Sequence, residues 1–314
     1  VNVNTKFVMG AGKLTDVIIQ ALQSGAELLI FDRDLTPTQI RSISEITEMK
    51  VLDRTQLILD IFARRAHSQA GKIQVELAQL RYMLPRLSQS STAFSRLGGG
   101  IGARGPGETK LETDLRRVRD RIGYLERQLK SLTQQRVQQR TKRIRNRVSV
   151  VSIVGYTNAG KSTLLNALTN SHVPARDRPF ETLDTVSRCL RLFNGREVII
   201  TDTVGFIRDI PQGLLNAFRS TLEELHDADL LLHVIDGSAS DFNQQIEIVE
   251  NILTDLGLDQ VPRIFVLNKC DRLESKMMET LCRRYQAIGV SALRKETLAP
   301  ILSDIAEVLS LIHI

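Results

Sequence analysis

The sequence predicts an α/β protein in three parts: a small parallel α/β domain at residues 1–54, an antiparallel helical hairpin of the coiled-coil type at 55–147, and a P-loop domain with a mostly parallel sheet at 148–309. Three observations lead to this expectation. Short apolar, β-branched runs alternate with helical stretches in the first and last parts, as in βα units. Apolar residues recur every three or four positions through the middle part. A glycine-rich loop between an apolar run and a helical stretch opens the last part.

The composition suits a protein with more than one core. The chain has 314 residues, of which 42% are apolar. No run of about 18 apolar residues occurs, so we expect no membrane span, and the N-terminus lacks a signal-peptide pattern. The three cysteines follow no metal-ligand spacing, which suits a reducing compartment. We expect a cytoplasmic monomer, with peripheral attachment to a membrane left open. Residues 310–314 form an apolar tail of unclear origin.

The first part alternates between expected strands and helices. Strands are predicted at residues 6–9, 27–31 and 50–53, and helices at 14–22 and 36–48. The segment Gly10-Ala11-Gly12-Lys13 resembles a second nucleotide loop. It is too short for one and has no hydroxyl residue after the lysine, so a tight strand-to-helix turn is favoured.

The middle part carries two helical stretches, from residue 55 to about 86 and from about 109 to 147, joined by the glycine-rich tip loop 98–108. The apolar spacing predicts that they pack as an antiparallel hairpin, and a plain dimerising coiled coil is the alternative. The tip loop suits either a flexible linker or a close fit to a ribose-phosphate surface. The predicted seam consists of Ile73, Leu77, Leu80, Leu84 and Leu87 in the first helix and Leu111, Leu115, Val118, Ile122, Leu125, Leu129 and Leu132 in the second.

Positive charge is concentrated in the second of these helices. The formal net charge of the chain is +6, and residues 110–147 hold thirteen Lys or Arg against four Asp or Glu. A polyanion is the natural partner for such a helix.

The glycine-rich loop matches the phosphate-binding pattern of Gly, four residues, then Gly-Lys-Ser/Thr. It follows an apolar strand at 148–154 and precedes a helix at 162–168. Backbone amides of such a loop surround phosphates. Lys161 is expected along the β and γ oxygens, and the Ser162 hydroxyl is expected to coordinate Mg²⁺. The loop residues are Gly155, Tyr156, Thr157, Asn158, Ala159, Gly160, Lys161, Ser162 and Thr163.

Two further segments carry the parts of a γ-phosphate switch. Phe180 and Thr182 lie in a polar stretch before the next strand, and Thr182 is a candidate second hydroxyl for Mg²⁺. A strand at 197–202 ends in the sequence Asp202-Thr203-Val204-Gly205, in which Asp202 is expected to hold the Mg²⁺ shell and the Gly205 amide to contact the γ-phosphate. The next residue is Phe206, which cannot orient a water molecule. Slow intrinsic hydrolysis is therefore expected, accelerated by a partner or a monovalent cation.

A third motif predicts which base is bound. A buried strand at 263–267 leads into Asn268, Lys269 and, two residues later, Asp271, whose carboxylate can accept the N1–H and 2-amino hydrogens of guanine. Lys269 is expected to stack on the base, and Ser291, Ala292 and Leu293 to close over its O6 atom. Since the phosphate loop, Asp-x-x-Gly and Asn-Lys-x-Asp occur in order after predicted strands, the third part is predicted to be a GTPase domain with Lys161, Thr182 and Gly205 as its catalytic residues.

The motifs together resemble those of the HflX family of translational GTPases. Four stretches carry the resemblance, and the first is the most specific: 99–114, 155–163, 180–184 and 202–208. Thr185 stands where the family pattern usually has proline, and we expect no counterpart within these 314 residues of the small C-terminal domain that many members carry. Asn158 matches the asparagine with which relatives bind K⁺, which implies a K⁺ site at this residue.

The resemblance implies a ribosomal function. Members bind the large ribosomal subunit near the peptidyl transferase centre and split stalled ribosomes, often under heat stress. We therefore expect a GTPase that uses Mg²⁺, hydrolyses GTP to GDP and phosphate, binds the 50S subunit and its rRNA, and dissociates stalled 70S ribosomes. The alternatives are a GTP-dependent regulatory adaptor of a protease or membrane complex, and a 50S assembly factor.

Overall fold

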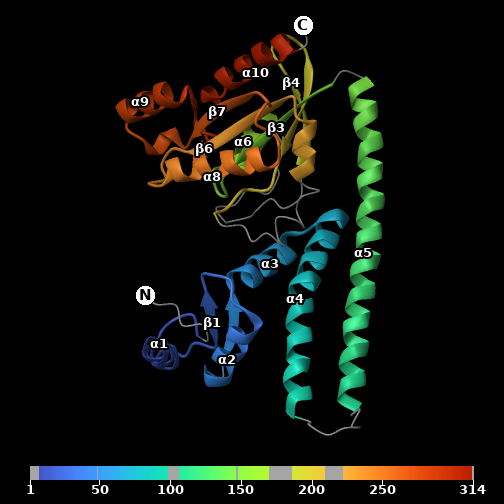
Figure 1. Cartoon of the computed structure of the whole chain (residues 1–314). Helices are drawn as coiled ribbons and strands as arrows, with labels where there is room; N and C mark the ends of the chain where they lie inside the picture. The colour runs from blue at the N-terminus through green and yellow to red at the C-terminus, as the bar shows by residue number, and fades with distance from the viewer. Residues whose placement is uncertain are drawn as a thin grey trace. The chain divides into compact units, whose positions relative to one another are not determined.

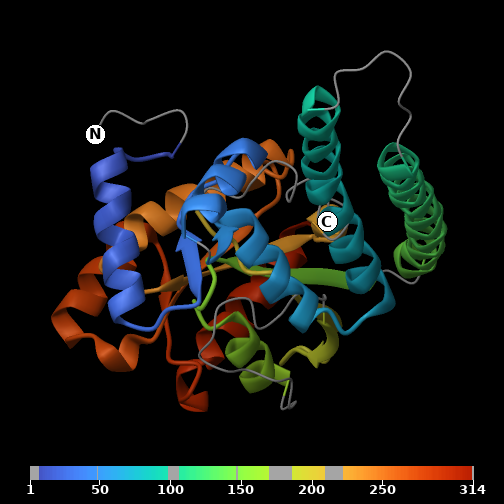
Figure 2. The ribbon, with the colours of Figure 1, turned by 90° about the horizontal axis from the view of Figure 1, so that it is seen from below.

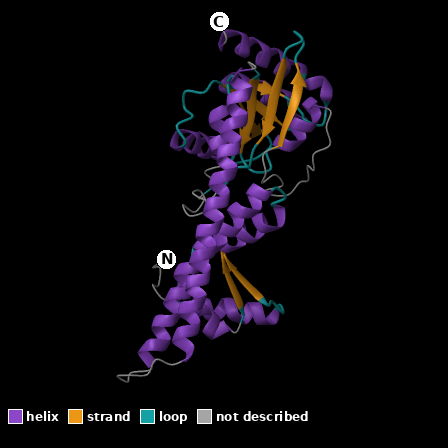
Figure 3. Cartoon of the chain, turned by 90° about the vertical axis from the view of Figure 1, so that its right-hand side faces the viewer, coloured by secondary structure: helices purple, strands orange, loops and turns teal. Residues whose placement is uncertain are grey.

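The computed structural model describes residues 7–47, 49–97, 106–145, 148–169, 186–208 and 222–312 (Figure 1). The chain divides into two compact units. One is built mainly from residues 1–64 and 72–129, and the other mainly from residues 130–210 and 218–314. Each unit has its own sheet, as the strands in Figure 3 show. The α/β class and the mostly parallel sheet of the P-loop part are confirmed.

The first unit contains a two-stranded parallel sheet with two helices packed on it. Strands β1 (Leu28–Phe31) and β2 (Lys50–Asp53) pair with Leu28 opposite Lys50. Helices α1 (Ala11–Gln23) and α2 (Pro37–Thr47) cover the sheet. The shared core consists of Val8, Leu14, Phe31, Leu35, Ile43 and Val51.

Local signals explain where these two helices begin. Gly10 precedes α1 with an extended backbone, and its carbonyl accepts a hydrogen bond from the Leu14 amide at 3.0 Å. Thr36 and Gln39 form a capping box before α2, because each side chain accepts a hydrogen bond from the backbone amide of the other residue, at 3.2 and 2.9 Å.

The strand predicted at residues 6–9 is wrong for the described residues 7–9, which form a turn. Val8 has a left-handed backbone (φ +69°), yet its side chain lies in the core. A strand is stabilised by pairing, and within the described part of the chain β1 pairs only with β2. The apolar run therefore contributes core contacts without a strand.

The middle part contains three helices: α3 (Arg54–Arg65), α4 (Gln69–Leu97) and α5 (Pro106–Arg145). The expectation of one continuous helix from residue 55 to about 86 is wrong, because the chain breaks before α4. There the Ser68 hydroxyl accepts a hydrogen bond from the Gly71 amide at 2.9 Å and starts a new helix.

Helices α4 and α5 lie side by side and antiparallel, as the prediction of a hairpin required (Figure 2). Ion pairs join their described parts: Arg121 contacts Glu76 and Arg81 contacts Glu126, each at 2.7 Å. Leu77 and Leu125 of the predicted seam are buried. The tip loop lies outside the described residues except for 106–108, which form the first turn of α5.

The second unit is organised around a six-stranded sheet with the order β4-β5-β3-β6-β7-β8. All neighbouring strands are parallel except β4 and β5, which are antiparallel. The strands are β3 (Ser149–Gly155), β4 (Val186–Arg191), β5 (Glu197–Asp202), β6 (Leu230–Asp236), β7 (Arg263–Asn268) and β8 (Ile288–Gly289).

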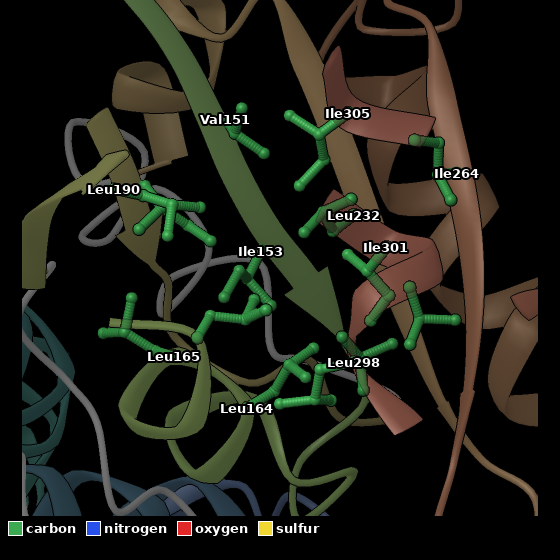
Figure 4. Packing of buried hydrophobic residues seen from close by; sticks show 14 of the residues in the cluster. Val151, Ile153, Leu164, Leu165, Leu190, Leu232, Ile264, Leu298, Ile301 and Ile305 are labelled. Carbon is green, nitrogen blue, oxygen red and sulfur yellow. The ribbon is translucent and has the colours of Figure 1, made fainter. Parts of the chain in front are cut away.

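Helices α6 (Lys161–Thr169), α8 (Phe242–Asp255), α9 (Ser275–Tyr285) and α10 (Ala299–Ile312) flank this sheet. Short 3₁₀ segments span Glu223–Asp227, Cys270–Arg272 and Lys295–Thr297. Every residue of β3 is buried, and Val151 and Ile153 pack with Leu164 of α6 and Ile301 of α10 (Figure 4). Helix α10 continues to Ile312, so the first three residues of the segment 310–314 are helical. None of the helices in the described ranges has the length and apolar character needed to cross a bilayer.

Candidate nucleotide-binding site

The predicted nucleotide motifs follow strands whose carboxyl ends meet at one edge of the sheet. Gly155 ends β3 and residues 156–160 follow it, Asp202 ends β5, and Asn268 ends β7. These strands are parallel to β3 or to its neighbour β6, so their ends converge. Ligands of open α/β sheets bind at such an edge. Phe180 and Thr182 lie outside the described residues.

Two glycines of the phosphate loop are required by the backbone and by close neighbours. Gly155 has φ +150°, and a Cβ atom there would lie 2.3 Å from the Val234 carbonyl oxygen. Gly160 has φ +93°, and its Cβ would lie 2.3 Å from the Asn268 Nδ2 atom. The loop can therefore pass close to the neighbouring strands only with glycine at these positions.

The Lys161 side chain is buried beside the loop, with 6% of the residue exposed. Its Nζ atom donates a hydrogen bond to the Tyr156 carbonyl oxygen at 2.9 Å. Burial lowers the pKa of the ammonium group to about 8, while the nearby Asp202 carboxylate acts in the opposite direction. Burial removes water from the Lys161 ammonium group. A bound phosphate would supply the favourable electrostatic interaction that water supplies to an exposed lysine.

This lowered pKa predicts that nucleotide affinity falls at alkaline pH. A bound phosphate attracts the protonated form of Lys161, which in the free protein is lost as the pH rises through about 8. The affinity for GDP should be nearly constant below that pH and fall by about tenfold between pH 7 and pH 9. Equilibrium titration with fluorescent GDP measures this change. Guanosine is the matched control because it has the same base without phosphates, and an equal fall for both ligands would contradict the prediction.

The end of β5 supplies oxygen atoms of the kind that Mg²⁺ prefers. The Ser162 hydroxyl donates a hydrogen bond to the Asp202 Oδ2 atom at 2.5 Å, and Asp202 is fully buried. Mg²⁺ is usually bound by one or two protein oxygens together with waters and substrate phosphates. This hydroxyl and carboxylate therefore fit the ion without a second carboxylate, and the described residues contain no cluster of three or more His, Cys, Asp or Glu side chains that could form a self-sufficient metal site.

The segment after Asp202 runs alongside the phosphate loop. The Thr157 amide donates to the Phe206 carbonyl oxygen at 2.7 Å, and the Phe206 amide donates to the Gly155 carbonyl oxygen at 3.1 Å. A Cβ atom on Gly205 would lie 2.9 Å from the Lys161 Nζ atom. The Phe206 ring is buried, so its side chain offers nothing that could hold a water molecule. Thr203 is also buried, and its hydroxyl donates to the Ile153 carbonyl oxygen at 2.7 Å.

Asn268 joins the phosphate loop to the predicted base-binding loop. Its Nδ2 atom donates to the Ala159 carbonyl oxygen at 2.9 Å, and its Oδ1 atom accepts from the Ala292 amide at 3.0 Å. The Ser291 backbone is held in place by Thr297, because the Ser291 amide donates a hydrogen bond to the Thr297 hydroxyl at 3.0 Å. The structure thus brings together three segments that the sequence only placed in order.

Asp271 and Leu293 are both exposed to solvent. The Ser291 hydroxyl is the main cause that lowers the pKa of the Asp271 carboxyl below its usual value. Leu293 is 78% exposed. His233 of β6 is buried, with its Nδ1 atom 2.9 Å from a Glu250 carboxylate oxygen.

One functional candidate was missed in the sequence. Asp236 ends β6, and its carboxylate contacts the Lys269 ammonium at 2.7 Å. A polar residue at the carboxyl end of a parallel strand is the signal that could have drawn attention to it.

Family models match three segments of the chain. They are described as "GTP-binding GTPase N-terminal" for residues 1–63, "GTP-binding GTPase Middle Region" for 65–143 and "50S ribosome-binding GTPase" for 150–269.

Individual proteins match over most of the chain. It is 53% identical to GTPase HflX of Caldanaerobacter subterraneus subsp. tengcongensis, over 87% of this chain and 64% of the relative. It is 45% identical to GTPase HflX of Alkalihalophilus pseudofirmus, over 98% and 72%, and 46% identical to that of Escherichia coli K12, over 86% and 63%. The chain thus spans about two thirds of the length of these relatives.

A solved structure also resembles the chain as a whole. A GTP-binding protein from the archaeon Sulfolobus solfataricus, in complex with GDP, matches with a TM-score of 0.53 and 28% identity, over 98% of this chain and 88% of that one. The fold, the converging nucleotide motifs and the relatives agree, and the chain therefore belongs to the HflX family of GTPases.

Proposed function

We propose that the chain binds GTP at the sheet edge described above, hydrolyses it to GDP and phosphate, and binds the 50S ribosomal subunit to separate stalled 70S ribosomes. The observation that carries this proposal is the convergence of the phosphate loop, Asp202 and Asn268 at one edge of the sheet, in a chain that also carries a cationic helix. The family model for residues 150–269, described as a 50S ribosome-binding GTPase, supports the choice of partner.

The residues of this site would divide the chemistry of in-line attack by water on the γ-phosphate. Lys161 and the amides of the loop would neutralise charge on the β and γ oxygens. Ser162 and Asp202 would hold Mg²⁺, which adds further neutralisation when bound, and Thr182 is proposed as an additional ligand. The Gly205 amide would contact the γ-phosphate. Asn158 would hold K⁺, as its match to the asparagine of relatives implies. The ion would assist hydrolysis, because Phe206 offers the attacking water no side-chain partner.

Base recognition is assigned to the loop that Asn268 braces. The lowered pKa of Asp271 keeps its carboxylate ionised, as an acceptor of two guanine hydrogens must be. Lys269 would lie along the base plane, and Ser291, Ala292 and Leu293 would close the pocket.

Helix α5 supplies the proposed contact with rRNA. Arg116, Arg117 and Arg119 are exposed, and Arg117 forms only a 3.5 Å pair with the exposed Asp114. The ion pairs among the described side chains include neither Arg116 nor Arg119. Their charge is available to a phosphate backbone.

Sucrose-gradient sedimentation tests the proposed function. Protein loaded with GTP should migrate with 50S particles and convert 70S particles into subunits, while the GDP-bound protein should do neither. Intact 70S particles together with no migration at 50S would remove ribosome splitting from the proposal. The adaptor alternative predicts that second outcome.

Charge reversal on α5 should weaken binding to 50S particles. The variant with Arg116→Glu and Arg117→Glu is expected to lose at least about tenfold in affinity and to show a shallower salt dependence, because two phosphate contacts are lost. Reversal of Arg283 and Arg284 on α9 is the matched control, since these two adjacent arginines are also exposed on a helix. Equal losses in both variants would indicate a general charge effect and no specific role for α5.

A further inference from the structure

Asp236 lies at the junction of the base-binding and phosphate-binding loops. It is the last residue of β6, opposite Asn268 in the register of β6 and β7. The Gly237 amide donates to the Asn268 carbonyl oxygen at 3.0 Å, which ties the loop after β6 to the loop after β7. A Cβ atom at position 237 would lie 3.0 Å from side-chain atoms of Leu267 and Leu273, so these leucines would have to shift to admit one.

The Asp236 carboxylate is held from both sides. Its Oδ1 atom accepts hydrogen bonds from the Ser238 amide at 3.0 Å and from the Ser238 hydroxyl at 2.6 Å. Its Oδ2 atom is 2.7 Å from the Lys269 Nζ atom. The carboxylate is therefore preorganised to receive the ammonium group of Lys269 in one position.

Lys269 in turn bridges to the phosphate loop. Its Nζ atom donates to the Asn158 carbonyl oxygen at 2.9 Å. Both Lys269 and Asn158 have φ +63°, in the left-handed region that residues other than glycine seldom occupy. Such backbones persist where surrounding contacts hold them, and the bond between these two residues is one of those contacts.

The pair of Asp236 and Lys269 is largely shielded from water. The side chains are 15% and 17% exposed, so this contact differs from the exposed ion pairs on the helices of the same chain. A partly buried, charge-assisted hydrogen bond fixes geometry more firmly than a surface pair does.

We propose that Asp236 is a positioning residue for guanine recognition, which acts by anchoring the Lys269 ammonium so that the lysine stem lies along the base. This inference rests on the proposed function, because the base pocket is the one assigned there. In this role Asp236 acts through Lys269, to which its carboxylate is bonded. Its removal leaves Lys269 free to turn away from the base and loosens the Asn158 carbonyl of the phosphate loop.

The variant Asp236→Asn tests this role in the full chain, because asparagine keeps an acceptor for Ser238 and loses the charge that holds Lys269. The Kd values of GDP and GTP should both rise by about tenfold, mainly through faster release, while kcat at saturating GTP changes less than about twofold. A purely structural role would instead lower the melting temperature and kcat together. Asp241→Asn, which changes an exposed carboxylate at the start of α8, is the matched control and should leave both Kd values unchanged.

A double-mutant cycle decides whether Asp236 acts through Lys269. In a Lys269→Met background, Asp236→Asn should cause no further loss of affinity. A full tenfold loss in that background would overturn the inference. Ser238→Ala provides a milder second variant should Asp236→Asn fail to fold: it should weaken GDP binding by about threefold in the parent and have no effect beside Lys269→Met. Wild-type protein that binds no guanine nucleotide would contradict the proposed function itself, whereas normal binding with an inert Asp236→Asn contradicts only the positioning role.

Discussion

Asp271→Asn should lower the affinity for GDP and GTP by on the order of a thousandfold and create affinity for xanthosine diphosphate. The carboxylate of Asp271 can accept both the N1–H and the 2-amino hydrogens of guanine, whereas an asparagine amide places a donor where the 2-amino group also donates. Xanthine has a carbonyl at that position and accepts this donor. Competition titration with the two nucleotides measures the change.

The carboxylate form of Asp271 is favoured across the physiological pH range. Ser291 lowers the carboxyl pKa, so the ionised form persists below the usual range and is lost only as the pH falls through this lowered value. Asp255→Asn, at an exposed position near the end of α8, is a suitable control. Unchanged GTP affinity in Asp271→Asn would show that the base pocket lies elsewhere.

Arg86→Leu should destabilise the first unit by about 3 kcal/mol. The Arg86 guanidinium donates to the Asp53 Oδ2 atom at 3.1 Å and to the Leu35 carbonyl oxygen at 3.0 Å. Asp53 is fully buried at the end of β2, so removing the arginine leaves a buried carboxylate without its counter-charge. Urea unfolding followed by circular dichroism should show an earlier midpoint for this unit.

An exposed ion pair of the same unit provides the matched comparison. Arg41 contacts Glu45 at 2.7 Å on α2, with both side chains at least half exposed. Arg41→Leu should change the free energy of unfolding by no more than about 0.5 kcal/mol. Equal changes in the free energy of unfolding for the two substitutions would indicate that burial of Asp53 does not strengthen the contribution of its ion pair to stability.

The site was predictable where a short motif carries its own chemistry. The phosphate loop, Asp202 and Asn268 are recognisable because their residue types and spacing suit phosphate, Mg²⁺ and guanine. The order of strands that brings them together was not predictable in detail, since pairing joins residues far apart in the chain, such as Val151 and Leu230. Asp236 was missed for the same reason, because its partner Lys269 lies 33 positions further along the chain, directly after β7.

The prediction of the fold succeeded where the apolar periodicity extends over many residues. It failed where it depended on a short segment. The apolar spacing of α5 extends over many turns, and that helix formed close to its expected bounds, whereas the first expected helix divides into α3 and α4. The run at residues 6–9 has the composition of a strand, but Val8 reaches the core from a turn. The break before α4 coincides with a single N-cap residue, Ser68. The apolar spacing is regular on both sides of it, so the break could not be recognised from that spacing.

The two hydrogen bonds of the Asn268 side chain also limit local opening of the site. One joins the phosphate loop and the other joins the loop at Ala292, so neither loop can swing outward without giving up a bond made by the same carboxamide. Local opening at one end is therefore coupled to the other end. A ligand that contacts only one of the two loops is therefore constrained by the other loop as well.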